Sequence, residues 1–255
     1  MKTILIYDGS FEGLLSTVFY IYEYQIDQFS VVKTEEYVAN FFDKKEEIIS
    51  NSNKANRVWK ALSTKISANA KRKLYKAFLS ELPGIENKIC HFIQLAFASK
   101  YKIEKDFSNP TILEISKVVK MVDREKHRMD AFVRFRQTKD NIYFATIEPD
   151  FNVLPLNSDH FRERYADQKW IIYDVKRKYG LFYNLNTVTT ITLEIDEAIN
   201  NKQNELTFFS DTEVEFQQLW GNYFEHTNIK SRKNTSLHIK HVPKRYWKYL
   251  TEKKN

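Results

Sequence analysis

Residues 122–185 read VDREKHRMDAFVRFRQTKDNIYFATIEPDFNVLPLNSDHFRERYADQKWIIYDVKRKYGLFYNL. In residues 131–136, Ala131, Val133 and Phe135 point one way, and Phe132, Arg134 and Arg136 point the other. Residues 142–147 form a second apolar run. The tetrapeptide TKDN between them, residues 138–141, has turn chemistry. The pattern predicts a β-hairpin. Pro149 then closes its second strand, because proline cannot donate to a ladder.

The second half of this stretch predicts a helix and more strands. Asn157-Ser158-Asp159 can cap a helix that begins near His160. Residues 176–180 form a basic turn, in which Gly180 can supply a positive φ. Three segments have strand character: 170–174, 181–185 and 187–195. We therefore expect an antiparallel or mixed sheet with one polar face.

The N-terminal part begins with a strand and a capped helix. Residues 2–7 read as a buried strand, and Ser10 can cap a helix that runs to about Tyr24. A second strand is expected at residues 29–33. From there to residue 125 the apolar period is helical, and the expected helices are 56–65, 69–82, 85–99 and one that starts at Asn109-Pro110.

The fold class that follows is α+β, with a helical N-terminal half packed on a mixed or antiparallel β-sheet. Residues 3–7 should join or cover that sheet. A further amphipathic helix is expected from Asp211 to about His226. We expect a single compact unit over residues 1–255. Its natural subdivision is a mainly helical part, 1–125, and a part with the sheet, more helices and a basic C-terminal segment, 126–255.

The charge of the chain is concentrated at its end. The net charge is +7, and residues 230–255 hold nine Lys or Arg and one acid, Glu252. The rest of the chain is therefore nearly neutral. Basic side chains neutralise phosphates, and the neighbouring Tyr246, Trp247 and Tyr249 can stack on unpaired bases. The alternative is an ordered C-terminus whose aromatic side chains dock on the core.

Cofactor, membrane and localisation expectations follow from the composition. Cys90 is the single cysteine and lies in an apolar run, so this chain cannot hold an iron–sulfur cluster by itself. The histidines form no metal signature. We expect no cofactor, no metal and no membrane span, and a cytoplasmic protein, because the apolar run at residues 4–6 is too short for a signal peptide.

Candidate catalytic residues are Asp8, His127 and His160. Asp8 lies in an Asp-Gly-Ser turn between a strand and a helix N-terminus, where an active-site carboxylate and ordinary turn chemistry are both plausible. His127 with Asp130, and His160 with Asp159, could form one acid–base site if the fold brings them together. Such residues are more often buried hydrogen-bonding groups or solvated helix ends.

Candidate nucleic-acid ligands are the arginines of the central stretch and three tail residues. They are Arg128, Arg134, Arg164, Arg177, Arg232, Lys244 and Arg245. The central arginines alternate with aspartates, which predicts either an ion-pair network or a phosphate-binding groove. In a groove, Phe132, Tyr173 or Tyr179 would serve as stacking platforms.

The sequence resembles an uncharacterised bacterial family described as acting in DNA metabolism. Its members are encoded beside a radical-SAM protein thought to act in DNA modification or repair, and some are fused to a uracil-DNA glycosylase domain. The residues that carry the resemblance span nearly the whole chain in order: Tyr7-Asp8-Gly9-Ser10-Phe11-Glu12-Gly13, His127-Arg128-Met129, Phe135, Pro149-Asp150-Phe151, His160-Phe161, Arg164, Trp170-Ile171-Ile172-Tyr173-Asp174, Arg177, Tyr179-Gly180, Leu219-Trp220, Tyr223-Phe224, Arg232, Asn234, Pro243 and Arg245-Tyr246-Trp247.

Two functions fit these observations. The first is an accessory protein in DNA repair or modification, which binds DNA or RNA and works with a radical-SAM partner, as the resemblance implies. The second is a DNA-acting enzyme of unknown reaction that uses Asp8, His127 or His160. The basic tail and the absence of a recognisable catalytic motif favour the first.

Overall fold

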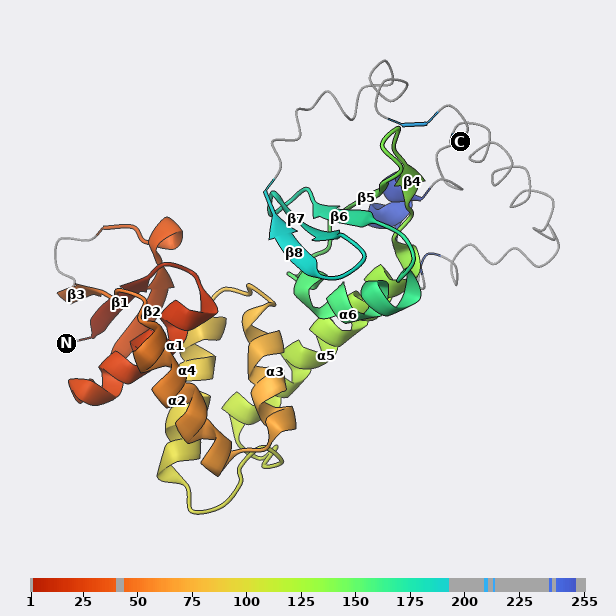
Figure 1. The fold of residues 1–255 in the computed structure, drawn as a ribbon. Helices are drawn as coiled ribbons and strands as arrows, with labels where there is room; N and C mark the ends of the chain where they lie inside the picture. The colour runs from red at the N-terminus through yellow and green to blue at the C-terminus, as the bar shows by residue number, and fades with distance from the viewer. Residues whose placement is uncertain are drawn as a thin grey trace. The chain divides into compact units, whose positions relative to one another are not determined.

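The computed structural model describes residues 2–39, 44–192, 209–210, 213, 239 and 242–250. The chain divides into two compact units, residues 1–123 and 124–255. Each unit contains helices and a β-sheet of its own (Figure 1). The α+β class predicted from the sequence is confirmed. Among the described residues, none of the helices has the length and hydrophobicity that a bilayer crossing needs.

The N-terminal unit contains a small parallel sheet. Its strands are β1 (Thr3–Tyr7), β2 (Phe29–Lys33) and β3 (Lys44–Glu47), in the order β2-β1-β3. Helix α1 (Phe11–Glu23) supplies the crossover that two parallel strands require. The expectation that residues 3–7 join the sheet of the central stretch is wrong, because β1 pairs with β2 and β3 instead.

The three helices predicted after β3 are present, but α2 begins four residues before the predicted start and α3 ends four residues before the predicted end. They are α2 (Ser52–Lys65), α3 (Ala68–Phe78) and α4 (Ile85–Ala98), and a short 3-10 helix, η1, spans Thr34–Glu36. The Asn51 and Ser67 side chains cap α2 and α3 by accepting backbone N–H bonds. Gly84 adopts φ +76° directly before α4, between the helices predicted at 69–82 and 85–99. Cys90 is fully buried in α4.

Helix α5 (Pro110–Phe132) is longer than the sequence pattern predicts. The strand expected at residues 131–136 is wrong: the helix continues through Phe132, and β4 is only Arg136–Gln137. The buried stripe of α5 extends to Met129, which is 2% exposed. A short alternation of side chains after that point cannot outweigh a helix that already packs its apolar face. The second strand of the hairpin is confirmed as β5 (Tyr143–Ile147).

The C-terminal unit is built on a five-stranded mixed sheet. After β5 come β6 (Trp170–Asp174), β7 (Tyr179–Tyr183) and β8 (Val188–Ile191), and the order is β4-β5-β6-β7-β8. Strands β5 and β6 are parallel and the other pairs are antiparallel. Helix α6 (Leu154–Arg164) makes the crossover between the parallel pair, so the predicted mixed sheet is confirmed.

Two local predictions in this unit are wrong. Helix α6 begins at Leu154, with Pro155 in its first turn, and not near His160. Asn157 is buried inside the helix, where its amide nitrogen donates to the Lys126 carbonyl at 3.0 Å. In the β6–β7 turn the positive φ belongs to Lys178, at 56°, and not to Gly180.

Gly180 is needed in β7 for a different reason. A Cβ atom there would lie 2.9 Å from the Ile172 carbonyl oxygen and 3.1 Å from the Tyr173 ring. The last described part of the chain is the 3-10 helix η4 (Lys244–Tyr249). The helix predicted at residues 211–226, the end of the strand predicted at 187–195, and Arg232 lie outside the described residues.

Candidate nucleic-acid interface

A buried glutamate organises the basic side chains of the C-terminal unit. Glu125, on α5, is 1% exposed. Its carboxylate accepts hydrogen bonds from the Asp150 backbone N–H at 2.9 Å and from the Arg245 guanidinium at 2.9 Å. The Tyr246 hydroxyl also donates to it, and Arg128 lies 3.4 Å away. A buried charge requires such partners, so Glu125 fixes where these groups lie.

The η4 segment is held against the unit by contacts of its neighbouring residues Arg245 and Tyr246. Tyr246 is 1% exposed, and its ring lies 5.6 Å from that of Phe132. Burial and the hydrogen bond to Glu125 raise the pKa of Tyr246, so the hydroxyl stays protonated and keeps donating. Arg245 lies beside it and bridges Glu125 to the Asp150 carboxylate at 2.7 Å. The expected docking of tail aromatics is therefore seen at Tyr246.

A second arginine shapes the loop that follows β5. The Arg177 guanidinium donates to the Pro149 carbonyl at 3.1 Å and to the Asp150 carbonyl at 3.1 Å. It also pairs with Asp174, which is fully buried, at 2.8 Å. Arg177 therefore acts on the backbone of the loop, and this contact fixes the Pro149-Asp150 peptide next to η4.

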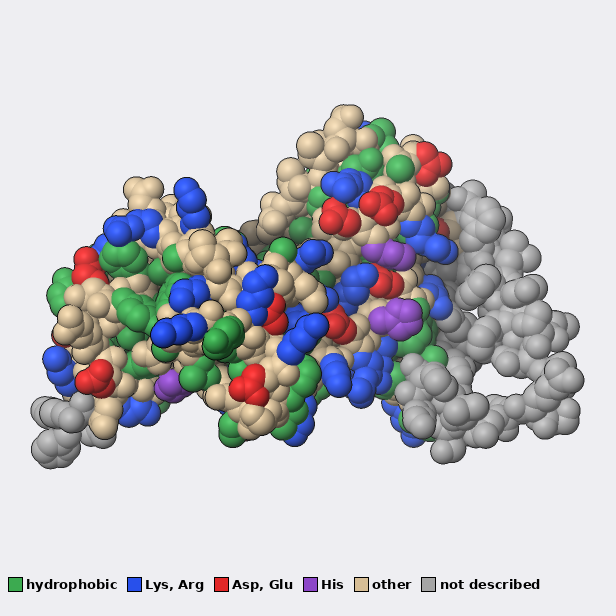
Figure 2. Space-filling model, turned by 90° about the horizontal axis from the view of Figure 1, so that it is seen from below, with side chains coloured by type: hydrophobic (Ala, Val, Ile, Leu, Met, Phe, Trp, Pro, Cys, Tyr) green, Lys and Arg blue, Asp and Glu red, His purple; other side chains and the backbone are tan. Residues whose placement is uncertain are grey.

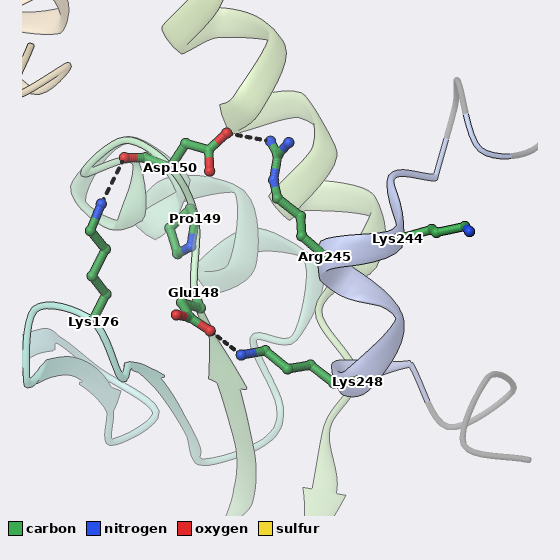
Figure 3. Close-up of a pocket in the computed structure, with 7 residues that line it drawn as sticks. All are labelled: Glu148, Pro149, Asp150, Lys176, Lys244, Arg245 and Lys248. Atoms are coloured by element: carbon green, nitrogen blue, oxygen red, sulfur yellow. Dashed lines mark hydrogen bonds and ion pairs between the residues drawn. The ribbon is translucent and has the colours of Figure 1, made fainter.

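These contacts line a pocket of about 520 Å³. Its residues come from the loop after β5, the β6–β7 turn and η4 (Figure 3). They are Glu148, Pro149, Asp150, Lys176, Lys244, Arg245 and Lys248. Four cations therefore surround two carboxylates, and the pocket has an excess of positive charge.

The four basic side chains differ in whether they form an ion pair with a carboxylate. Arg245 pairs with Asp150, and Lys248 pairs with Glu148. Lys176 donates to the Asp150 carbonyl at 3.4 Å, and Lys244 extends away from the acidic residues in Figure 3. Within the described part of the chain, neither Lys176 nor Lys244 forms an ion pair with a carboxylate. Both side chains are exposed and available to an anion.

Acid should loosen η4 from the unit. The hydrogen bonds from Lys248 and Tyr249 lower the pKa of Glu148. A carboxylate with a lowered folded pKa stabilises the docked state above its ordinary pKa, and that contribution is lost as the pH falls through the folded value. We therefore expect amide hydrogen exchange in residues 244–250 to accelerate, beyond the intrinsic effect of pH, below about pH 4.3.

The matched control for this pH effect is Glu148→Gln, which cannot titrate. Exchange in residues 244–250 should already be faster in this variant at neutral pH, and it should gain less on acidification. Hydrogen-exchange mass spectrometry of both proteins measures the difference. Identical pH profiles for the two proteins would show that Glu148 does not hold the segment.

The other predicted basic ligands divide between this site and other places in the unit. Arg128 joins the Glu125 cluster, whereas Arg134 donates to the Ala131 carbonyl at 2.8 Å. Arg164, at the end of α6, is exposed and packs over the Tyr165 ring at 5.7 Å. The structure therefore brings together Arg128, Arg177 and Arg245 around one loop.

The candidate stacking rings already have partners. Tyr173 is 3% exposed and packs in the core with Phe144 and Phe209. Phe132 packs against Tyr246, and the Tyr179 hydroxyl donates to Asn152 at 2.5 Å. These contacts favour recognition of phosphates at this surface over base stacking on those rings.

The candidate catalytic residues lie in different units. Asp8 follows β1 in the N-terminal unit, and His127 and His160 lie on α5 and α6 of the C-terminal unit. His127 is exposed. The Nε2 atom of His160 is buried, and no residue that the structure describes hydrogen-bonds to it. Among the described residues, no group of three or more His, Cys, Asp or Glu side chains is arranged to hold a metal ion.

The Asp8 carboxylate accepts three hydrogen bonds from hydroxyl and amide donors. Ser10 donates to it from its backbone N–H at 2.9 Å and its hydroxyl at 2.7 Å, and Ser50 donates at 2.7 Å. Partial burial by itself would raise the pKa of Asp8, but the hydrogen bonds from Ser50 and Ser10 outweigh it and lower the pKa. The Ser10 hydroxyl also accepts from the Gly13 N–H, which is the predicted helix cap. These contacts are those of the turn and of the helix cap.

The sequence profile of a family described as a domain of unknown function, DUF4130, matches residues 83–252. The chain belongs to this family. The matched residues of the DUF4130 family include Glu125 and every residue that lines the pocket. No curated protein matches the chain. Among solved structures, a pGpG-specific phosphodiesterase, PggH from Vibrio cholerae, is 12% identical with a TM-score of 0.33; the alignment covers 80% of this chain and 87% of that one.

Sequence reasoning misses three members of this DUF4130 site. Glu125 resembles a solvent-exposed helix residue, and its partners Arg245 and Tyr246 lie 120 and 121 residues away. Lys176 reads only as part of a turn, and Lys248 only as part of the tail charge. The available signal is the charge pattern of the β6–β7 turn, K-R-K, shortly after a buried strand.

Proposed function

We propose that the C-terminal unit binds nucleic acid through the phosphates, at the pocket between the Pro149-Asp150 loop and η4. The observation that supports this most is the presence of Lys176 and Lys244 in a pocket of net positive charge, without an ion pair to any described residue. Lysine is a common phosphate ligand, and phosphate contacts supply most non-specific affinity. In sequence, residues 230–255 are also rich in Lys and Arg.

The ion pairs of Arg245 give it a different role. Its guanidinium is held by Glu125 and Asp150, so its position is fixed before any ligand arrives. A phosphate at the pocket would meet a cation that is already oriented, which reduces the entropy lost on binding. Removing Arg245 would also leave Glu125 with fewer partners, so this residue is a poor choice for a clean binding test.

The sharp test changes the two unpaired lysines. In Lys176→Gln/Lys244→Gln, each phosphate that is no longer neutralised should reduce the slope of log affinity against log salt by about 0.9 on duplex DNA. The total reduction is about 1.8 if both lysines bind phosphates. Fluorescence anisotropy with labelled duplex DNA, over a series of salt concentrations, measures the slope. Both side chains are exposed, so stability should change by less than about 0.5 kcal/mol.

The matched control is Lys139→Gln/Lys169→Gln. These lysines are also exposed and belong to the same unit, but they do not line the pocket. The control removes the same net charge and should keep most of the wild-type slope. If the two double variants have equal slopes, the loss of net charge alone explains the change. That result would reject the pocket as the binding site.

We propose further that the protein acts in DNA repair or modification beside a radical-SAM enzyme. Support comes from the resemblance to the bacterial DNA-metabolism family. The cluster of such an enzyme must belong to the partner, because Cys90 is the single cysteine and is fully buried. Burial raises the pKa of the Cys90 thiol, which makes it a poor cluster ligand.

Affinity capture tests the partnership. The chain, co-expressed with a radical-SAM protein of the kind that the resemblance implies, should retain that protein on a column at low salt. DNA should strengthen the retention if both proteins bind one nucleic acid. No association at any salt concentration, with and without DNA, would contradict the proposal.

A further inference from the structure

The N-terminal unit carries a second basic surface, formed by α2 and α3. These helices contain eight Lys or Arg residues and no Asp or Glu. The net charge of the chain outside the tail is near zero, because acidic residues elsewhere offset these eight basic residues. The net charge therefore gives no sign of this basic surface. Figure 2 shows many Lys and Arg side chains, and fewer Asp and Glu, on the face that it displays.

Most of these basic side chains form no ion pair with a described carboxylate. Lys54 pairs with Glu23 at 2.8 Å, and Lys76 pairs with Asp123 at 2.5 Å. The other six make no ion pair with any residue in the described ranges. They are Arg57, Lys60, Lys65, Lys71, Arg72 and Lys73. Six unpaired cations on two adjacent helices repel one another, and a bound polyanion would remove that cost.

The fold directs the cations outward. Each helix buries its apolar stripe, which is Ala55, Val58 and Leu62 in α2 and Ala70, Leu74 and Ala77 in α3. At 3.6 residues per turn, Arg57 and Lys60 lie opposite the stripe of α2, and Arg72 lies opposite that of α3. All three side chains are exposed. The outer side of each helix is therefore basic.

Lys71 ties the two helices together. From α3, its ammonium group donates to the Trp59 carbonyl at 2.9 Å and to the Ser63 hydroxyl at 2.8 Å, both on α2. It also lies 4.1 Å from the centre of the Trp59 ring. These contacts fix α3 beside α2 within the N-terminal unit, so the basic side chains of the two helices are carried by neighbouring elements.

The residues between the cations fit nucleic acid better than a membrane. The exposed positions on the two helices are small or polar: Asn53, Asn56, Ala61, Ser63, Thr64, Ala68 and Asn69. A membrane-binding helix needs large apolar side chains that enter the bilayer, and here the apolar stripes face the core of the unit. Asparagine, serine and threonine side chains hydrogen-bond phosphate oxygens in protein–DNA contacts.

Nearby aromatic rings are occupied. Lys54 and Arg57 each lie 5.0 Å from the centre of the Phe19 ring. Trp59 meets the edge of Phe11 and is covered by Lys71. These rings are therefore covered by other side chains and cannot stack on bases. A nucleic acid at this surface would be contacted through its phosphate backbone.

We propose that the α2–α3 surface is a second nucleic-acid site, which binds the phosphate backbone of duplex DNA without reading its sequence. It goes beyond the pocket of the C-terminal unit and lies outside residues 83–252, which the family profile matches. The site requires neither the pocket nor the tail, so each surface can be tested while the other is intact.

The test uses the full chain with Arg57, Lys60 and Arg72 all changed to Gln. The salt slope of duplex DNA binding should become shallower by about 2.7, which is about 0.9 for each phosphate that is no longer neutralised. The matched control changes Lys2, Lys44 and Lys45 to Gln. These residues belong to the same unit, are also exposed, and lie near the amino ends of β1 and β3. This control should keep most of the slope.

The outcomes separate this proposal from the pocket. A shallower slope in the α2–α3 variant, with the control unchanged, supports the second site even if Lys176→Gln/Lys244→Gln has no effect. A slope equal to that of the control overturns it, whatever the pocket variant does. A last experiment measures binding to vesicles that contain an anionic phospholipid. If the α2–α3 variant binds DNA like the wild type but no longer binds the vesicles, the surface is a lipid site and the proposal is overturned.

Discussion

Glu125→Ala is expected to destabilise the C-terminal unit by about 3–5 kcal/mol, because it leaves buried partners without their carboxylate. The Tyr246 hydroxyl and the Asp150 N–H would both lose their acceptor. Among the described residues, Arg245 would keep only Asp150 as its carboxylate partner. The η4 segment should then detach, which makes residues 244–250 exchange their amide hydrogens faster.

Two milder variants separate the contributions to this effect. Glu125→Gln keeps an acceptor oxygen but removes the charge, so its cost should be smaller than that of Glu125→Ala. Tyr246→Phe removes one donor and keeps the buried ring, and should cost about 1 kcal/mol. Urea unfolding, followed together with hydrogen exchange, measures all three. Unchanged exchange in residues 244–250 of Glu125→Ala would contradict the anchoring role of the carboxylate.

Trp170→Ala is expected to cost about 3–5 kcal/mol, because it opens a large cavity behind the sheet. Trp170 is 0% exposed, and its ring lies 5.5 Å from Tyr183 and 6.2 Å from Phe161. These partners come from β7 and α6, so the side chain joins the sheet to the crossover helix. Urea unfolding of the full chain measures the loss of stability.

Trp170→Phe is the control that isolates packing. The Trp170 Nε1 atom is buried, and none of the described residues accepts a hydrogen bond from it. Replacement by Phe therefore removes ring volume and no hydrogen bond, and it should cost less than half as much as Trp170→Ala. An equal loss of stability in both variants would mean that the indole nitrogen is used and that packing is not the main contribution.

The strands that the sequence predicts best are those with the clearest burial. Residues 170–174 and 142–147 are predicted almost to their ends, because their apolar side chains face a packed core. Strand β3, with the sequence KKEE, escapes prediction because it lies at the edge of its sheet and has no apolar pattern. Charged residues are common on such edges, where they discourage pairing with other chains.

The basic site is predicted only in part for a different reason. Local sequence identifies Lys244 and Arg245 as exposed cations, but it cannot show that Glu125 holds Arg245 from 120 residues away. Long-range ion pairs leave no periodic signal. The α2–α3 surface is hidden when charge is summed over long segments, and a local count of acids within each helix reveals it.

Helix α5 limits how the protein can be dissected. The boundary between the two units, at Asp123 and Arg124, falls inside this unbroken helix. A fragment that starts at Arg124 would place Glu125 in a fraying first turn, where the backbone N–H groups have no acceptors. A fragment that ends at Asp123 would remove the hydrogen bonds that its last turn receives. Truncated proteins should therefore each retain the whole of α5, so that the same 23 residues appear in both.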